Sequence, residues 1–506
     1  MKILAISITY LLLFSSIRAQ KMSYSISMDE PATHYFQVTL QCTAIKEKTL
    51  DFKMPVWSPG YYQRLDYAKN VENFTATDTK GNPVQWEKPA GNTWRVAAGN
   101  DHTIVLHYAV KTTRMFVATP YVDTARGYII PAGVFLHIAG KLNLPVEITV
   151  KPFSAWKNVA TGLEPVAGKP FTYSAEDFDI LYDSPLLVGN LEELPPFYVQ
   201  GIPHRFIGYK LGEFNRQQLM SELKKIVEAS VNIIGHIPYK HYTFIAIGPG
   251  QGGIEHLNNT TLSFGGEGLS SAEGRLRMLN FIAHEYFHHY NVKRIRPIEL
   301  GPFDYDNGSR TKQLWISEGL TVYYEYLAVK RAGLSTEVDI LNALQANILD
   351  YETKTGRLYQ SLAEASYETW SDGPFGRSGD KVSKTISYYA KGPVVGMLFD
   401  FVIRHETKNS KSLDDVMRFL YSEYYQKQKR GFTEDEFKAA VKKIAGNPLN
   451  ELFEYVYTTK ELDYTKYLAY AGLEIDVTDR SFRMKRKANP TTLQLSILQS
   501  WLGEKL

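Results

Sequence analysis

The sequence predicts a multidomain α+β protein, in which an N-terminal β-sandwich precedes a larger mixed domain that ends in a mainly helical part. Three observations lead to this fold class. Apolar residues alternate with period two up to about residue 170, helical periodicity prevails afterwards, and 506 residues are enough for several domains with their own cores. The single cysteine cannot form an internal disulfide, so packing has to stabilise these domains.

The first 19 residues have the pattern of a secretory signal peptide. Lys2 precedes an apolar run at residues 3–14, and small residues lead to Ala19. The alternative is a membrane anchor, but a membrane-spanning helix needs about 20 apolar residues. We therefore expect residues 1–19 to be removed on export, no transmembrane segment, and a periplasmic or secreted protein.

Residues 20–170 are predicted to form the β-sandwich. In residues 35–45, side chains such as Phe36, Val38 and Cys42 alternate with polar ones, as in a strand with one buried face. Residues 104–110 and 146–150 alternate in the same way. The many aromatic residues of this region could form a sugar-binding platform, although core packing is their commoner role. Cys42 is then a core residue.

Residues 171–465 are predicted to form one large domain. Asn215 and Gln218 have the pattern of a capping box at the start of a helix that Gly235 ends. Further along the chain, Pro393 is typical of a helix start, and Thr433 with Glu436 predicts another capping box. The last part of this domain should therefore be mainly helical.

A glycine-dense turn at residues 248–256 lies between two predicted strands, at 241–247 and 260–264. The turn lacks the G-x-x-x-x-G-K-[ST] pattern of a phosphate-binding loop, so we discard a nucleotide-binding function. Glycines permit close approach of the backbone to a neighbouring group. Glu255 follows these glycines closely in the sequence, beside the place where the backbone would come close to that group.

The strongest chemical signal is the H-E-x-x-H motif HEYFH at residues 284–288, in a helix whose start is predicted at Ser270 and Glu273. Residues four apart lie on one face of a helix, so both imidazoles can bind one Zn²⁺. Glu285 is rotated off that line, towards a water at the metal. In another frame, Glu285 and His289 are also four apart and could pair or bind the metal.

A catalytic zinc site usually has three protein ligands. Glu318 lies among apolar residues in a predicted helix at residues 314–327, where a buried acid needs a partner such as a metal. A half-exposed position on an amphipathic helix is the alternative for Glu318, and Glu325 is a second candidate ligand on the same helix.

Several motifs together resemble the glycyl aminopeptidase family of zinc metallopeptidases, which is related to the aminopeptidase N and leukotriene hydrolase enzymes. The motifs are GGIEH at 252–256, HEYFH at 284–288, NVKRIRP at 291–297, EGLT at 318–321 and YAKG at 389–392. The resemblance extends to residues 55–61 and 412–417, and so covers most of the chain up to about residue 475.

The resemblance implies a thermolysin-like zinc peptidase domain at residues 171–465 with one Zn²⁺ per chain. The metal would be bound by His284, His288 and Glu318, and Glu285 would be the general base that takes a proton from the attacking water.

The remaining site residues are also implied by the resemblance. Tyr389 would donate a hydrogen bond to the oxyanion, with Tyr388 as a competitor for this role. Glu255, with Gly252 and Gly253 beside it, would bind the free α-ammonium group of the substrate.

The chain also departs from the pattern of the related enzymes. Residues 289–317 separate the second histidine from Glu318, a longer interval than in the relatives, which favours the glycyl branch. Val322 stands where some zinc peptidases have an acid that supports a zinc-binding imidazole, and Thr321 is a candidate replacement. Residues 466–506 are too few for a complete PDZ domain, and we expect them to be a solvated tail.

These features predict a zinc aminopeptidase that removes N-terminal residues, Gly or Ala in preference, from peptides with a free N-terminus. The alternatives are a broader aminopeptidase or an endopeptidase on the same site, and a peptide-binding protein with a dormant site. A formal charge of +3 is small for this length and disfavours nucleic acid as a partner. The sequence carries no signal for an oligomeric state.

Overall fold

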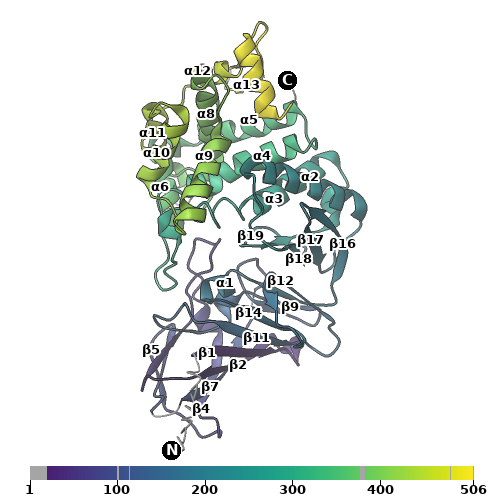
Figure 1. The fold of residues 1–506 in the computed structure, drawn as a ribbon, viewed down its shortest axis with the longest axis vertical. Helices are drawn as coiled ribbons and strands as arrows, with labels where there is room; N and C mark the ends of the chain where they lie inside the picture. The colour runs from purple at the N-terminus through teal and green to yellow at the C-terminus, as the bar shows by residue number, and fades with distance from the viewer. Residues whose placement is uncertain (1–19, 100–101, 113, 377–381, 479, 505–506) are drawn as a thin grey trace, which may run out of the picture.

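The computed structural model describes residues 20–99, 102–112, 114–376, 382–478 and 480–504. The predicted signal peptide at residues 1–19 lies outside these ranges. The N-terminal sheets lie at one end of the molecule, a mixed sheet lies in the middle, and the helices lie at the other end (Figure 1). The searched part of the chain contains no helix that is both long and apolar enough to span a membrane.

The N-terminal part contains three sheets. The first has the order β13-β14-β11-β1-β2-β7-β4. Its strands are β1 (Lys21–Ser27), β2 (Tyr35–Thr43), β4 (Val71–Thr77), β7 (Thr103–Lys111), β11 (Val146–Lys151), β13 (Glu164–Pro165) and β14 (Thr172–Ala175). The other two sheets consist of β3 (Leu50–Lys53), β5 (Trp86–Ala90), β6 (Thr93–Val96) and β10 (His137–Ile138), and of β8 (Tyr121–Val122), β9 (Arg126–Ile129), β12 (Asn158–Thr161) and β15 (Leu186–Gly189).

The alternation of apolar residues confirms the predicted fold class. On β2, Phe36, Val38, Leu40 and Cys42 are buried while the residues that alternate with them are not, and the predicted strands at 104–110 and 146–150 correspond to β7 and β11. The predicted boundary at residue 170 comes too early, because β14 and β15 still belong to the N-terminal sheets. The segment before β14, which contains Gly168 and Pro170, is a turn that connects two paired strands, β13 and β14.

A five-stranded mixed sheet follows, in the order β16-β17-β18-β20-β19. Its strands are β16 (Glu192–Val199), β17 (Ile202–Gly208), β18 (Tyr242–Gly248), β19 (Gly253–Glu255) and β20 (Asn259–Ser263). The two predicted strands at 241–247 and 260–264 are β18 and β20, each shifted by one residue. Glu255 ends the edge strand β19.

Two helices belong to the same stretch of the chain as this mixed sheet. Helix α2 (Arg216–Ile234) lies between β17 and β18 in the sequence, and α3 (Ala272–Phe287) follows β20. Asn215 caps α2 by accepting a hydrogen bond from the Gln218 backbone N–H, and Gly235 ends it with φ 90°. The cap of α3 is Ser271, not Ser270 as predicted, and Ser271 accepts from Gly274 N–H. Ser270 instead ends the preceding 3-10 turn in a helical conformation, which is incompatible with an N-cap.

The remaining helices form the top layer in Figure 1. They are α4 (Leu320–Arg331), α5 (Glu337–Thr353), α6 (Leu362–Tyr367), α7 (Thr369–Asp372), α8 (Tyr388–Glu406), α9 (Leu413–Leu420), α10 (Glu434–Ala445), α11 (Asn450–Tyr457), α12 (Tyr464–Tyr470) and α13 (Thr492–Leu502), with a short α1 (Phe178–Tyr182) in the N-terminal part. The Thr433 and Glu436 capping box of α10 is present as predicted.

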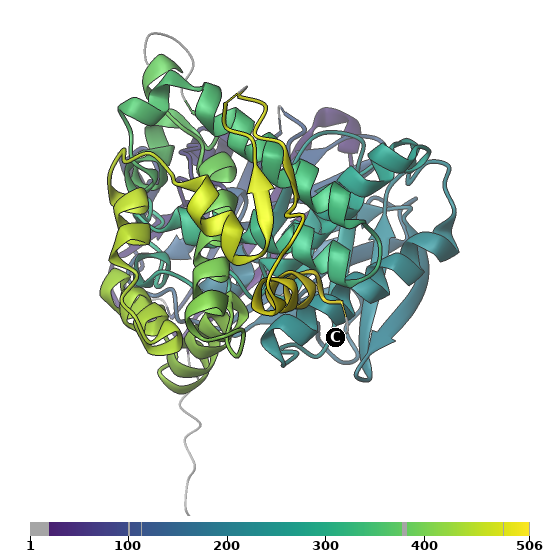
Figure 2. The ribbon, with the colours of Figure 1, turned by 90° about the horizontal axis from the view of Figure 1, so that it is seen from above.

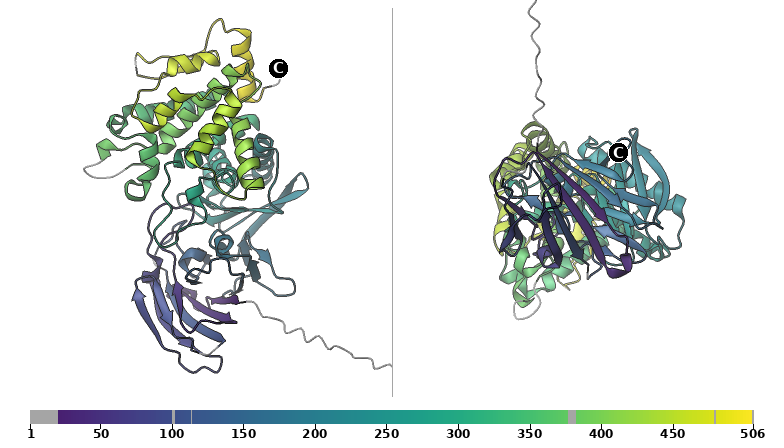
Figure 3. Two further views of the ribbon diagram at one scale, coloured as in Figure 1. Left: turned by 60° about the vertical axis from the view of Figure 1, so that its left-hand side comes forward. Right: turned by 90° about the horizontal axis from the view of Figure 1, so that it is seen from below.

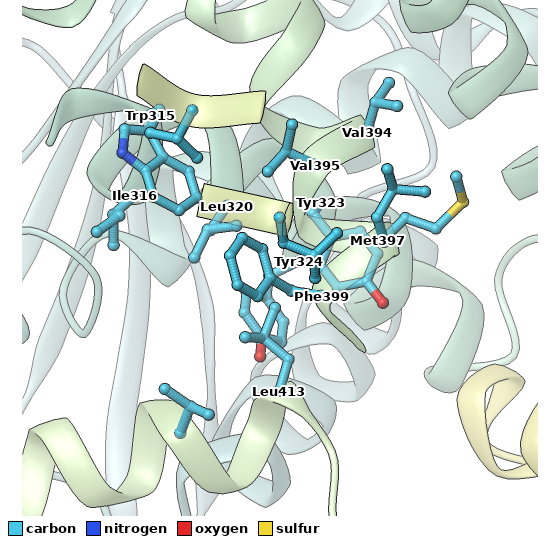
Figure 4. Close-up of a cluster of buried hydrophobic side chains, with 14 of the residues drawn as sticks. Trp315, Ile316, Leu320, Tyr323, Tyr324, Val394, Val395, Met397, Phe399 and Leu413 are labelled. Atoms are coloured by element: carbon cyan, nitrogen blue, oxygen red, sulfur yellow. The ribbon is translucent and has the colours of Figure 1, made fainter. Parts of the chain in front are cut away.

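Apolar residues of α4 and α8 form the centre of this layer. Leu320 and Tyr323 of α4 lie beside Val394, Val395 and Phe399 of α8, and all five are buried (Figure 4). This packing holds the two helices that border the candidate site in one relative position.

The prediction that Pro393 starts a helix is wrong, because α8 begins five residues earlier, after the cap Ser387. Proline has no N–H, so the carbonyl of Tyr389 one turn earlier lacks its helical donor. Asn347 Nδ2 of α5 donates to this carbonyl at 3.1 Å. A side chain from another helix therefore makes the internal proline tolerable.

The predicted solvated tail is also wrong for its described residues. Strands β21 (Leu473–Ile475) and β22 (Met484–Arg486) form a hairpin, and α13 lies with it against the other helices (Figures 2 and 3). Trp501 of α13 is 0% exposed, and its Nε1–H donates to Tyr323 Oη at 2.8 Å. The basic residues of this segment suggested exposure to solvent, but α13 has a buried apolar face that includes Ile497 and Leu498.

We predict that Trp501→Ala lowers the free energy of unfolding by about 3–5 kcal/mol, because it removes a fully buried indole from the contact between α13 and α4. Differential scanning calorimetry should show a lower melting temperature. Leu495→Ala is the matched control, since Leu495 lies on the same helix and is 38% exposed. Equal melting temperatures for the two variants would contradict the docking of α13.

Candidate metal centre and active site

His284, His288 and Glu318 converge in the described structure as a group that could bind a metal ion. One ligand atom of each lies within 4.8 Å of the others. The two Nε2 atoms are 2.9 Å apart, and Glu318 Oε2 lies 3.7 Å from His284 Nε2 and 3.2 Å from His288 Nε2. All three side chains are buried.

The tautomers of the two imidazoles fit a metal. His284 Nδ1 lies 2.8 Å from Glu325 Oε2, and His288 Nδ1 lies 2.7 Å from the carbonyl oxygen of Asn291. Oxygens of this kind accept hydrogen bonds, so each Nδ1 carries a hydrogen, and in the neutral form of each imidazole Nε2 keeps the lone pair that a metal needs. Two lone pairs and a carboxylate oxygen that face one point in a buried site suit the N and O ligation of Zn²⁺.

Glu318 lies in a π-helical turn, Trp315–Gly319, that directly precedes α4. Such turns leave carbonyls without their usual helical donors and are frequent at functional sites. Asn291 Nδ2 donates to the carbonyls of Ile316 at 2.7 Å and Ser317 at 3.2 Å. Since the Asn291 carbonyl also accepts from His288, this one residue fixes both the second histidine and the Glu318 turn.

Two partners of the imidazoles differ from the sequence-based expectations. Glu325, a candidate ligand in the sequence, is hydrogen-bonded to His284 and lies outside the ligand group. Thr321 Oγ1 lies 3.4 Å from His288 Nδ1, but it donates to the Ser317 carbonyl at 2.7 Å. The stronger supporting contact of His288 is therefore the Asn291 carbonyl, which no side-chain pattern could reveal.

The alternative frame through His289 does not agree with the structure. Its ring packs against Tyr239, Tyr242 and Tyr286. Burial lowers its pKa well below the ordinary value, so the imidazole is neutral. His289 is a core residue of the layer between the sheet and α3.

Glu285 faces the cleft from α3, directly beside strand β19. A Cβ atom at Gly253 would lie 2.7 Å from both Cδ and Oε1 of Glu285, so only glycine permits this approach. Within the described residues Glu285 Oε2 has no hydrogen-bond partner. Burial raises the pKa of Glu285 to about 8, against the opposing charges of His284 and His288.

The carboxylate of Glu318 and the phenol of Tyr389 are hydrogen-bonded. Tyr389 Oη donates to Glu318 Oε2 at 2.8 Å. Burial favours a higher pKa for Glu318, but the charge of His288 and the hydrogen bonds of both imidazoles hold its pKa below the ordinary value. The competitor Tyr388 shares a hydrogen bond with Thr369 Oγ1 at 3.1 Å instead.

Glu255 is 4% exposed, and its Oε1 has no hydrogen-bond partner among the described residues. Lys293 Nζ lies 3.9 Å from this oxygen and forms a shorter ion pair, 2.7 Å, with Asp183 Oδ1. Lys293 is therefore held mainly by Asp183 of the N-terminal part. Oε1 of Glu255 therefore makes no hydrogen bond among the described residues, and Lys293 Nζ at 3.9 Å is the cation recorded beside it.

A cleft of ≈ 1160 Å³ connects these groups. Residues of β19, α3, α4, α5 and α8 line it, together with residues 60–63 of the N-terminal part. His284, Glu285, Tyr388 and Tyr389 are exposed to this cleft, as is Gly253. Glu285 and Tyr389 thus line the cleft beside a group of residues that could bind a metal ion.

Two regions of the chain match family models. Residues 23–190 match the model of the Peptidase M61 N-terminal domain, and residues 277–395 match that of the M61 glycyl aminopeptidase. No curated protein matches the chain.

Among solved structures, the chain is similar to an aminopeptidase N family protein from Idiomarina loihiensis, with 26% identity and a TM-score of 0.84, over 90% of this chain and 79% of that one. An M1 zinc metallopeptidase from Deinococcus radiodurans shares the fold at 14% identity and a TM-score of 0.54, over 88% and 94% of the two chains. Aminopeptidase A from Legionella pneumophila, solved with aspartic acid, shares it at 10% identity and a TM-score of 0.55, over 87% and 49%.

We predict that Glu325→Ala weakens zinc binding by about 10- to 100-fold, because the imidazole of His284 loses the acceptor that fixes its tautomer and orientation. Competition with a chromogenic chelator measures this affinity. Asp350→Asn is the matched control, since it removes a carboxylate that lines the same cleft and pairs with Lys354 instead of an imidazole. Equal zinc affinities for both variants would remove Glu325 from this supporting role.

Proposed function

Because this chain belongs to the M61 glycyl aminopeptidase family and is a zinc metallo-aminopeptidase, we propose that it releases N-terminal residues, Gly or Ala in preference, from peptides. The observation that carries the proposal is the position of Glu285 between the buried group of His284, His288 and Glu318 and the glycine strand β19. We further propose one zinc ion per chain, bound by these three residues, and export directed by residues 1–19.

When bound, zinc would polarise the scissile carbonyl and make a water molecule more acidic. Glu285 is the general base, because its Oε2 lies at the cleft without a hydrogen-bond partner among the described residues. The same carboxyl then gives the proton to the leaving amine. The buried position of Glu285 favours its protonated form and so supports the second transfer.

Tyr389 stabilises the negative charge that develops on the carbonyl oxygen of the substrate. Its ring borders the cleft, and its single phenolic hydrogen, donated to Glu318 at 2.8 Å in this structure, would turn to the substrate oxygen. Burial and the charge of Glu318 raise the pKa of Tyr389 well above the ordinary value. The phenol therefore keeps its proton and can donate it in a hydrogen bond.

Glu255 accounts for the restriction to N-termini. A buried carboxylate oxygen without a hydrogen bond, with Lys293 Nζ 3.9 Å away, would bind an ammonium group strongly, whereas a neutral peptide amide gains nothing comparable. Gly252 and Gly253 allow the substrate backbone to lie close to β19 beside it. Gly60 of the N-terminal part covers Glu255, since a Cβ at Gly60 would lie 3.0 Å from Glu255 Oε2. An endopeptidase would need the cleft to continue past this point.

We predict that Glu285→Gln keeps about one zinc per chain but lowers kcat/KM for Gly- and Ala-arylamides by about 100- to 10,000-fold, since the amide cannot accept the proton. Metal analysis and arylamine release measure the two quantities. A parent protein with one zinc per chain and no release from either substrate would contradict the proposed reaction.

We predict that Glu255→Gln lowers kcat/KM for substrates with a free amine by at least about 30-fold, because the ammonium loses a buried charged partner. The measurement compares free and N-acetylated Gly-arylamide. Glu273→Gln, on the exposed start of α3, is the control and should behave as the parent. Equal cleavage of the two substrates by the parent would exclude this role of Glu255.

A further inference from the structure

The N-terminal part of the chain reaches into the cleft through the segment between β3 and the 3-10 turn Tyr67–Asn70. Gly60, Tyr61, Tyr62 and Gln63 of this segment line the cleft opposite Glu285. The catalytic residues themselves come from the other part of the chain. Residues of the N-terminal part and residues of the following part therefore form the wall of the cleft together.

Contacts with residues 303–305 and with Trp370 hold this segment in place. Trp57 Nε1 donates to the Asp304 carbonyl at 2.7 Å, and Val56 N–H donates to the Tyr305 carbonyl at 2.9 Å. The ring of Trp57 also makes an edge contact with Trp370 at 5.1 Å. Because Val56 and Trp57 are held by these contacts, the residues that follow them in the chain, from Gly60 to Gln63, have a fixed position.

Gly60 permits the segment to approach the catalytic part closely. Its φ is 90°, and an added Cβ would lie 2.7 Å from Ile254 Cγ2 and 3.0 Å from Glu255 Oε2. The backbone of this segment therefore packs directly on strand β19. Two residues later, Tyr62 lines the cleft and belongs to the same buried cluster as Tyr388.

Tyr62 is 7% exposed and borders the cleft. Burial, and then the charges of Glu318 and Glu255, raise the pKa of Tyr62 well above the ordinary value. Burial and the charges of the same two carboxylates also raise the pKa values of Tyr388 and Tyr389. The rings of Tyr62, Tyr388 and Tyr389 line the same cleft and pack in one cluster, and the ring of Tyr62 is the one supplied by the N-terminal part.

An N-terminal residue bound in this site has to lie in that cleft. Its α-nitrogen and its carbonyl carbon are bonded to the same Cα and lie about 2.5 Å apart. If Glu255 binds the ammonium and the metal group binds the carbonyl, the Cα and its side chain lie between them. The side chain then points towards the surrounding rings.

Building on the proposed aminopeptidase function, we propose that Tyr62 is a specificity-determining residue, whose ring closes the space into which an N-terminal side chain larger than alanine would extend. Close-packed walls reject added methylene groups because the surrounding structure cannot yield without strain. The preference for Gly or Ala then originates in the N-terminal part of the chain.

The test compares the parent with Tyr62→Ala, Tyr62→Leu and Tyr62→Phe. The ratio of kcat/KM for Leu-arylamide to that for Gly-arylamide should rise by about tenfold or more in Tyr62→Ala, and less in Tyr62→Leu. Tyr62→Phe keeps the ring and should keep the ratio. Tyr61→Ala is the matched control, because Tyr61 lies on the same segment but packs against Phe116.

A binding measurement separates this inference from the proposed reaction. Calorimetry gives the affinities of the zinc-loaded proteins for glycine hydroxamate and leucine hydroxamate, without turnover. If the ratio of the affinity for leucine hydroxamate to that for glycine hydroxamate rises in Tyr62→Ala, the ring of Tyr62 limits the size of the bound side chain, even if no arylamide is cleaved. An unchanged ratio in both Tyr62→Ala and Tyr62→Leu, at the melting temperature of the parent, would overturn it.

Discussion

The site depends on a direct contact between two backbones, at Gly319 and Gly392. A Cβ at Gly319 would lie 2.7 Å from Gly392 Cα, and one at Gly392 would lie 2.6 Å from Gly319 Cα. Because both positions lack a side chain, the π-helical turn of Glu318 packs directly on α8, and Tyr389 reaches Glu318. A larger residue at either position would separate the helices and lengthen the hydrogen bond between the phenol and the carboxylate.

Charge balance explains how such a site can be buried. Four acidic side chains, Glu255, Glu285, Glu318 and Glu325, lie in the cleft wall or next to residues of that wall with little exposure, and of the described Lys and Arg residues only Lys293 comes within 4 Å of one of them. Burying unpaired carboxylates is strongly unfavourable. A divalent cation at the ligand group and an ammonium at Glu255 would supply the missing positive charge. The same electrostatics that oppose folding of the empty site therefore favour both proposed ligands.

Local rules allowed much of this site to be predicted from the sequence. The four-residue spacing of HEYFH fixes two histidines on one helix face, and an acid within an apolar helix points to Glu318. The role of Glu325 could not be predicted, because it depends on a π-helical turn whose extra residue changes the rotation of the helix that follows. Pro393 misled for a similar reason, since the compensating donor, Asn347, comes from a different helix. Contacts between distant segments leave no periodic pattern in the sequence.

The position of Tyr62 is the clearest example of a feature that could not be predicted from the sequence. The motif at residues 55–61 is visible in the sequence, but its place at the active site arises only when Trp57 packs against residues 303–305 and Asp183 pairs with Lys293. His284, His288 and Glu318 come from α3 and the turn before α4, whereas the cover over Glu255 and the partner of Lys293 come from Gly60 and Asp183 of the N-terminal part. Under the proposed function, the metal ligands therefore come from one part of the chain, whereas the residues proposed to select the substrate end come from both parts.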